Sequence, residues 1–199
     1  ITYFIVIATF VVVQILIDAG FISSLFQGLM VPICTYIILA ISLNLVVGIL
    51  GELSLGHAGF MCVGAFSSAF FSKVMQDVIT NASLRFFLAM LVGIIIAAVF
   101  GLVIGIPVLR LNGDYLAIVT LAFGEIIKNL VSILFIGKDS KGFHFSTKDV
   151  LSLNMKPDGK VIVNGPQGIT GAPKDATFFI GFIPVSYTHL RAHETCADL

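Results

Sequence analysis

The longest uncharged stretch of the sequence limits the folds that this chain can adopt. No Asp, Glu, Lys, Arg or His occurs in the 33 residues from Ala19 to Gly51. A helix needs about 20 predominantly apolar residues to cross a bilayer. Lipid admits only helices and closed barrels, because the backbone must satisfy its own hydrogen bonds there. Barrel strands alternate apolar and polar residues, whereas the apolar blocks of this chain are continuous, so the sequence predicts helices.

The charge content also indicates a membrane protein. Asp, Glu, Lys and Arg make up 11% of the residues, whereas a soluble domain has about 25%. The chain therefore lacks the charge to cover a surface in water. The formal net charge is zero and no basic cluster stands out in the sequence, so nothing predicts nucleic-acid binding.

The apolar blocks predict an all-α, polytopic helical membrane protein with about five transmembrane helices and a truncated sixth. The predicted spans are residues 1–17, 27–50, 55–76, 84–109 and 115–136. A hydrophilic loop is expected over 137–176, and the apolar stretch Thr177–Val185 is too short to cross. The first span has no basic flank, so we do not expect it to be a signal peptide. We expect residues 1–185 to be an internal fragment of one longer transmembrane domain.

The last residues, 186–199, differ in composition from the apolar stretch that they follow. Taken alone, they hold four possible metal ligands, with two histidines four residues apart on one helix face. These are His189, His193, Glu194 and Cys196. However, the stretch VSYTHLRAHET resembles translated sequencing-adapter read-through. We therefore predict that residues 186–199 are not part of the natural protein and expect no metal site.

Residues 44–66 combine glycines with the ionisable side chains Glu52 and His57. Glycines stand at positions 48, 51, 56, 59 and 64. Small residues let membrane helices approach closely, and glycine also permits a break in a helix. Irregular backbone at membrane depth must be buried in protein or line a wet cavity. We expect residues 51–56 to form either a turn between two spans or an unwound segment, with both polar groups away from lipid.

Three blocks of sequence resemble the permease subunits of branched-chain amino-acid ABC importers. The family pattern N-L-x-x-G-x-x-G-x-x-S-L-G-H-A-x-F-x-x-x-G-A falls on Asn44–Ala65. A second block, Asn112–Ile126 (NGDYLAIVTLAFGEI), and a third, Gly165–Pro173 (GPQGITGAP), are similar to blocks of the same proteins in the same order. The second and third blocks favour the LivM-type subunit.

The resemblance implies a transmembrane permease subunit of an ATP-driven importer in the bacterial inner (plasma) membrane. It implies a homologous permease as partner, two cytoplasmic ABC ATPases that use ATP-Mg, and a periplasmic or lipid-anchored substrate-binding protein. The chain itself is expected to bind no cofactor and to be no enzyme. The implied cargo is leucine, isoleucine or valine, with urea or short amides, which close relatives carry, as the alternative.

The orientation in the membrane follows from the resemblance and conflicts with one rule. A cytoplasmic N-terminal side places residues 18–26, 77–83 and 137–176 outside, and 51–54 and 110–114 inside. Cytoplasmic loops usually carry the excess of lysine and arginine, yet the 137–176 loop is rich in lysine. Its lysines are Lys138, Lys141, Lys148, Lys156, Lys160 and Lys174.

The candidate site residues are polar groups in or near the predicted spans. We assign to the substrate pathway or its gating, as a hypothesis, Asn44, Glu52, Ser54, His57, Asp114, Tyr115, Thr120 and Glu125. Structural hydrogen bonding is the alternative for His57 and Asn44, and a place at the membrane interface is the alternative for Glu52. Glu125 can pair with Lys128, three residues on, either facing the bundle or lining the pathway.

A stripe of small residues recurs every four positions in the fourth span. Gly93, Ala97, Gly101 and Gly105 make up this stripe, which is typical of close helix packing.

Two other classes of protein stay open at this stage. A secondary transporter or channel would need no ATPase, but such folds often show internal repeats, and the 44–66 pattern has no second copy. An intramembrane enzyme would need a nucleophile–base pair or a metal constellation, and Glu52 with one histidine does not supply it.

Overall fold

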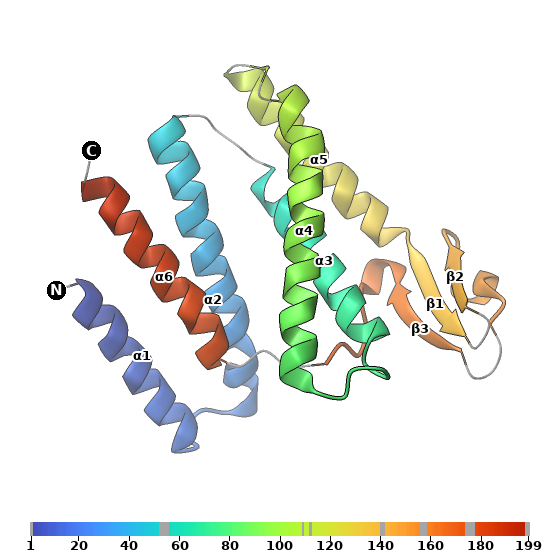
Figure 1. Cartoon of the computed structure of the whole chain (residues 1–199), viewed down its shortest axis with the longest axis horizontal. Coiled ribbons are helices and arrows are strands. Elements are labelled where there is room, and N and C mark those ends of the chain that lie inside the picture. The colour runs from blue at the N-terminus through green and yellow to red at the C-terminus, as the bar shows by residue number, and fades with distance from the viewer. Residues whose placement is uncertain are drawn as a thin grey trace. The chain divides into compact units, whose positions relative to one another are not determined.

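The computed structural model describes residues 2–51, 56–108, 110–111, 113–139, 142–155, 159–173 and 178–197 (Figure 1). The chain divides into two compact units, which are described separately. The first consists of Ile1–Glu52 and Ala176–Leu199, and the second of Leu53–Asp175.

The first unit contains helices α1 (Thr2–Asp18), α2 (Ser24–Leu45) and α6 (Phe178–Ala197). The rings of Phe10 and Phe182 stack with centroids 4.2 Å apart and so join α1 to α6. Gly181 of α6 lies against Cys34, because a Cβ built at Gly181 would be 3.4 Å from the Cys34 Cβ. Small residues at this contact allow α6 to approach α2 closely.

The end of α2 carries the helix break that the glycines predicted. A π-helical turn, Val46–Leu50, follows α2, and Gly51 then adopts a left-handed conformation with φ of +69°. The next helix begins at His57. A residue with positive φ ends a helix, and glycine adopts it without steric cost. Residues 52–55, with the predicted site residues Glu52 and Ser54, lie outside the described part.

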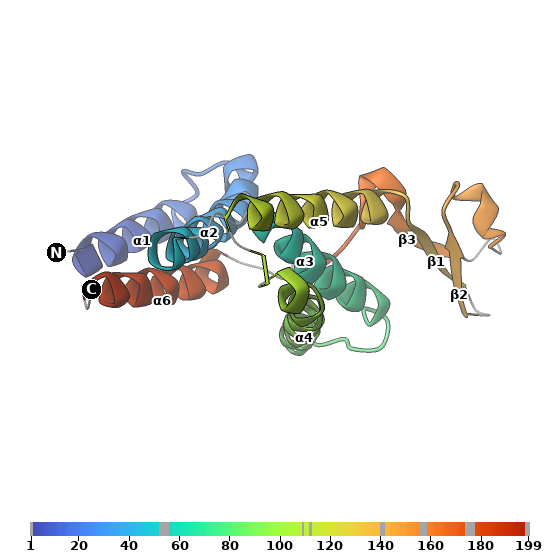
Figure 2. The ribbon, with the colours of Figure 1, turned by 90° about the horizontal axis from the view of Figure 1, so that it is seen from above.

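The second unit is built on helices α3 (His57–Val74), α4 (Ala82–Val108) and α5 (Asp114–Ser132). Figures 1 and 2 both show α4 beside α3. The two helices approach at Gly64 and Gly93, where a Cβ built at Gly93 would be 2.8 Å from the Gly64 carbonyl oxygen and 3.0 Å from the Ser68 Cβ. The absence of a side chain at position 93 therefore sets the spacing between α3 and α4.

A three-stranded antiparallel sheet follows α5. Its strands are β1 (Phe135–Asp139), β2 (Gly142–Ser146) and β3 (Lys160–Asn164), in the order β2-β1-β3. The sheet packs on the last turns of α3 through a small hydrophobic core. The buried members of this core are Val74, Ile136, Ile162 and Val163.

The sheet lies largely where the sequence analysis expected only a hydrophilic loop, over residues 137–176. Its first strand also shortens the predicted span 115–136, since α5 ends at Ser132 and β1 starts at Phe135. The strands were missed because each is five residues long, and because β1 and β3 mix lysine with apolar residues. The apolar partner for their inner face comes from α3, which lies far away in the sequence.

The helical class is confirmed, while the number of spans stays a prediction. In the described part of the chain, three helical segments are long and apolar enough to cross a membrane, namely Ser24–Gly48, Ala82–Val108 and Tyr115–Ser132. A shorter apolar segment, Ile7–Asp18, lies in α1. Helix α6 continues through residues 186–197. That these residues are not part of the natural protein stays a prediction. The side chains of their four possible metal ligands lie outside the described set.

Candidate functional site

Two of the three family-like blocks meet where the start of α3 crosses α5. Gly56 caps α3 and lies directly against Thr120, because a Cβ built at Gly56 would be 2.5 Å from the Thr120 carbonyl oxygen and 2.9 Å from its Cβ. One turn further along α3, a Cβ at Gly59 would be 2.9 Å from the Cα of Gly124. The backbones of the two helices are therefore in direct contact over these residues.

Aromatic side chains flank this glycine contact. The rings of Phe60 on α3 and Phe123 on α5 lie with centroids 5.0 Å apart and planes tilted by 40°. Such offset pairs contribute about 0.5–1.5 kcal/mol beyond the area that they bury. The crossing thus combines a close backbone approach with a ring contact, which holds α3 and α5 as one rigid pair.

Thr120 and His57 are the predicted site residues that the crossing brings together. Thr120 is buried, and its hydroxyl donates to the carbonyl oxygen of Ala117 at 3.0 Å. His57 is half-buried in the first turn of α3, where the helix dipole presents its positive end. This arrangement can hold a polar or anionic group at the start of α3.

The third family-like block fastens the sheet to the ends of α3 and α5. The Gly165 N–H donates to the Leu134 carbonyl oxygen at 3.1 Å, just beyond α5. The Gly171 carbonyl oxygen accepts a hydrogen bond from the Lys73 Nζ at 2.6 Å, in the last turn of α3. All of the second and third blocks, and the part of the first from Leu53 onward, therefore belong to the second unit.

Glu125 and Lys128 form the ion pair that their spacing predicted. The Lys128 Nζ lies 2.9 Å from the Glu125 Oε1, and the two side chains are 68% and 57% exposed. Glu125 stands five residues after Thr120, which turns it by about 140° away from the buried face of α5. Tyr115, at 72% exposure, is also open. A charged pair inside a span is costly against lipid, so this face must meet protein or water.

The remaining predicted pathway residues are not gathered at the crossing. Asn44 is exposed on α2, in the first unit. Asp114 is the first residue of α5, and its side chain lies outside the described set, like the whole of Glu52 and Ser54.

The stripe of small residues on α4 divides into two halves. Gly93 and Ala97 pack on α3, and a Cβ built at Gly64 would be 3.6 Å from the Ala97 Cβ. A Cβ at Gly101 or Gly105 would meet no atom of the described residues within 4 Å. Packing of this second half against a helix of another chain, or of another part of the protein, stays a prediction.

The partners of these glycines, and a group of lysines beside the sheet, were not predicted from the sequence. Lys73, Lys138 and Lys160 line one pocket with the end of α3. Lys138 follows Lys73 by 65 positions, and Lys160 follows Lys138 by 22. The three lysines come together because the sheet folds onto α3. The sequence offered one signal for this group: Lys73 stands near the end of a predicted span, and Lys138 and Lys160 stand in the predicted hydrophilic loop.

These apolar helices and glycine crossings define a polytopic helical membrane protein. The sequence model of one family, described as "Branched-chain amino acid transport system / permease component", matches residues 25–154. The chain belongs to this family of membrane permeases.

Two curated relatives agree with this assignment and support a LivM-type permease. The high-affinity branched-chain amino acid transport system permease protein LivM of Escherichia coli (strain K12) is 37% identical over 147 residues. The protein of the same name from Salmonella typhimurium (strain LT2) is 36% identical over 147 residues. Each match covers 74% of this chain and 27% of the relative, so the chain spans about a quarter of their length. No solved structure matches the chain.

Proposed function

We propose that the intact protein is a permease subunit of an ATP-driven importer of branched-chain amino acids in the bacterial inner membrane. The observation that carries the proposal is the 37% identity to a protein named as a branched-chain amino acid permease. The match covers 74% of this chain, and the family model itself covers residues 25–154, including the helices of the α3–α5 crossing.

In this proposal the chain forms the pathway together with a homologous permease. Two cytoplasmic ABC ATPases hydrolyse ATP-Mg, and a periplasmic or lipid-anchored binding protein delivers the substrate. The chain performs no covalent chemistry and binds no cofactor of its own. Its task is to expose the pathway first to one side of the membrane and then to the other.

The α3–α5 crossing supports a mechanism in which these two helices move as one body. Direct backbone contact at Gly56 and Gly59 leaves no room for sliding, because packed interfaces shift between discrete arrangements and do not deform continuously. The π-helical turn Val46–Leu50 and left-handed Gly51 precede this body. π-Helical turns are frequent at functional sites, so we place the hinge there.

The proposal is tested by transport into proteoliposomes that contain the full-length permease with its four proposed partners. Uptake of radiolabelled leucine, isoleucine and valine is expected to require ATP on the ATPase side and the binding protein on the other. ADP in place of ATP serves as the control. Uptake without ATP would show a secondary transporter or channel, and uptake of urea or acetamide in place of leucine would show the alternative cargo.

His57 provides a test of the gating role proposed for the first block. We expect His57→Ala to insert and assemble normally but to lower the uptake rate, because the substitution removes the polar group at the start of α3. Phe60→Leu, one turn along the same helix, is the matched control for a change of packing alone. Normal uptake by His57→Ala would limit His57 to a structural hydrogen bond.

For Thr120 the corresponding variant is Thr120→Ser, which keeps the hydroxyl group, so we expect it to transport normally.

A further inference from the structure

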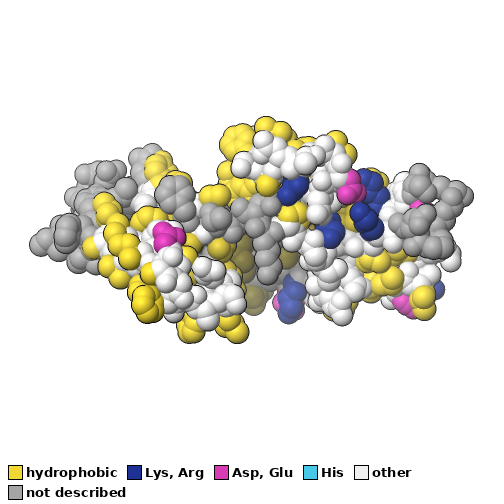
Figure 3. Space-filling view, turned by 90° about the horizontal axis from the view of Figure 1, so that it is seen from below, with side chains coloured by type: hydrophobic (Ala, Val, Ile, Leu, Met, Phe, Trp, Pro, Cys, Tyr) yellow, Lys and Arg dark blue, Asp and Glu magenta, His cyan; other side chains and the backbone are white. Residues whose placement is uncertain are grey.

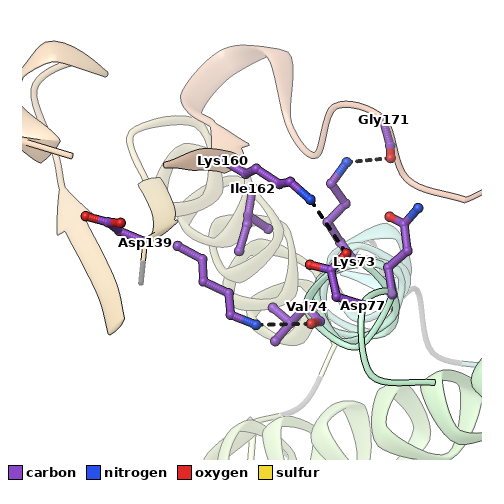
Figure 4. A pocket seen from close by; sticks show the side chains of 9 residues that line it. Lys73, Val74, Asp77, Asp139, Lys160, Ile162 and Gly171 are labelled. Atoms are coloured by element: carbon purple, nitrogen blue, oxygen red, sulfur yellow. Dashed lines mark hydrogen bonds and ion pairs between the residues drawn. The ribbon is translucent and has the colours of Figure 1, made fainter. Parts of the chain in front are cut away.

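A basic pocket lies between the end of α3 and the sheet (Figure 4). It has a volume of about 430 Å³. Helix α3 and the turn after it supply one wall, and strands β1 and β3 supply the other. The charged residues that line it are Lys73, Asp77, Lys138, Asp139 and Lys160.

Two of the three lysines in this pocket keep an unneutralised charge. The Lys73 Nζ donates to the Gly171 carbonyl oxygen at 2.6 Å, and the Lys138 Nζ donates to the Val74 carbonyl oxygen at 3.4 Å. Backbone oxygens carry no net charge, and an ammonium group has three donors. Each of these lysines is therefore held in place while donors remain for a ligand.

The aspartates leave this basic character intact. The Asp77 Oδ1 is paired with the Lys160 Nζ at 3.5 Å, so these two charges offset each other. Asp139 is buried at 8% exposure, and Figure 4 shows its carboxylate pointing away from Lys73 and Lys160. The pocket thus presents an excess of positive charge from Lys73 and Lys138.

An apolar groove of about 420 Å³ adjoins the basic pocket. Helices α3 and α4 form its floor, and strands β1 and β2 form its rim. Its lining residues are Phe66, Ser67, Phe70, Phe71, Val92, Ile96, Ile136 and Phe145.

The pocket and the groove follow each other along two elements. On α3 the groove residue Phe70 precedes the pocket residue Lys73 by three positions, a rise of about 4.5 Å. On β1 the groove residue Ile136 precedes Lys138 by two, about 7 Å along the same face. Phe143 bridges the junction, with its ring 6.3 Å from that of Phe70 and 6.0 Å from the Lys138 Nζ.

The groove leads from the membrane surface toward the bilayer interior. Arg85 is the last charged residue before the uncharged stretch of α4. Val92 and Ile96 lie seven and eleven residues beyond it, at depths of about 10 and 16 Å. Half of the hydrocarbon core of a bilayer is about 15 Å thick. The groove therefore lies at a depth that acyl chains occupy, and the lysines stand at its outer end.

We propose that the basic pocket and the apolar groove together bind one anionic phospholipid, with its phosphate at Lys73 and Lys138 and an acyl chain along α3 and α4. Charge complementarity selects the anionic headgroup, since basic pockets at the ends of membrane helices bind such headgroups. Figure 3 shows lysine and arginine side chains gathered beside hydrophobic surface on the face seen from below. An acidic soluble protein would use the pocket but would leave the groove unexplained.

The test is native mass spectrometry of the intact permease released from nanodiscs that contain equal amounts of dioleoyl phosphatidylglycerol and dioleoyl phosphatidylcholine. The wild type is expected to retain phosphatidylglycerol preferentially. Each surface lysine contributes about a fivefold preference for anionic lipid, so Lys73→Gln with Lys138→Gln should lower the ratio roughly 25-fold. Ser67→Phe, which fills the groove, should lower retention of the lipid while the lysines remain.

Two controls make the result decisive. Lys73→Arg with Lys138→Arg keeps the charges and should keep the preference, which separates loss of charge from loss of folding. Lys148→Gln removes an exposed lysine of the same segment outside the pocket and should have no effect. Equal retention of both lipids by the wild type, or an unchanged preference in the double Gln variant, would overturn the proposal. So would a double Gln variant that keeps its lipid but loses the response to a soluble binding protein, because the surface would then dock that protein.

The proposal goes beyond the importer function and does not depend on the cargo. Lipid retention is read from the purified permease, whereas the importer function is read from ATP-dependent uptake. A permease that imports urea, or one that needs no ATP, would still give a clear answer in the lipid experiment.

Discussion

Gly56→Ala and Gly59→Ala are expected to force α3 away from α5 and to abolish transport. The added methyl group at position 56 would meet the Thr120 carbonyl oxygen at 2.5 Å, and at position 59 it would meet the Gly124 Cα at 2.9 Å. Both contacts involve backbone atoms, which cannot rotate away as a flexible side chain can. Overpacking of this kind typically costs about 1–3 kcal/mol, and here it acts at the contact that joins two helices.

The matched control lies in the same crossing. A Cβ added at Gly124 would meet the Gly59 nitrogen at 3.9 Å, an ordinary contact, so Gly124→Ala should be tolerated. The three variants are compared by thermal unfolding in detergent and by uptake in proteoliposomes. Normal stability and uptake for both Gly56→Ala and Gly59→Ala would show that α3 and α5 are not in backbone contact in the working transporter.

The apolar helices could be predicted from the sequence because lipid imposes a simple rule. A membrane span must be long, helical and nearly free of charge, so hydropathy alone locates it. Helices α1 and α4 begin and end within two residues of the predicted spans 1–17 and 84–109. The ends are less certain where polar and apolar residues mix, as at α5, which gives way to β1 before the predicted boundary.

The sheet could not be predicted in the same way. Its inner face is buried by Val74 of α3, and the residues of β1 do not predict this contact. A five-residue strand such as Phe135–Asp139, with a glycine and a lysine in it, shows no clear alternation. The pairing of β1 with β3, across the 20 residues that separate them in the chain, is a property of the folded unit.

The candidate site was predicted in part. The family-like blocks identified Gly56, His57 and Thr120, yet the sequence does not say which glycine touches which residue. The stripe on α4 illustrates the limit. A Cβ added at Gly93 would lie 2.8 Å from a backbone oxygen, whereas a Cβ added at Gly101 would have no atom of the described residues within 4 Å. The repeat of four residues is the same for both, and only the position of α3 distinguishes them.

Gly165→Ala is expected to destabilise the sheet strongly, because Gly165 lies where the sheet is attached to the end of α5. It has a positive φ of +50°, and a Cβ there would lie 2.5 Å from Cζ of the Phe135 ring and 3.0 Å from both Cε atoms. Gly165→Ala therefore combines backbone strain with overpacking. Strained backbone costs about 1–3 kcal/mol, and the clash adds a similar amount. We expect the third block to detach and the sheet to open.

Local opening of the sheet is measured by the rate of trypsin cleavage at its lysines, since cleavage follows the free energy of opening. Gly168→Ala serves as the comparison, because Gly168 also has a positive φ, of +69°, but no atom within 4 Å of a Cβ. Each additional 1.4 kcal/mol corresponds to about a tenfold change, so Gly165→Ala should be cleaved about tenfold faster or more than the wild type. Phe135→Ala removes the ring, and in that background the penalty of Gly165→Ala should fall to its strain alone. The coupling between positions 135 and 165, which a double-mutant cycle isolates, is thus the decisive quantity. A coupling of zero would mean that the ring does not lie over Gly165, and the third block would then hold the sheet in some other way.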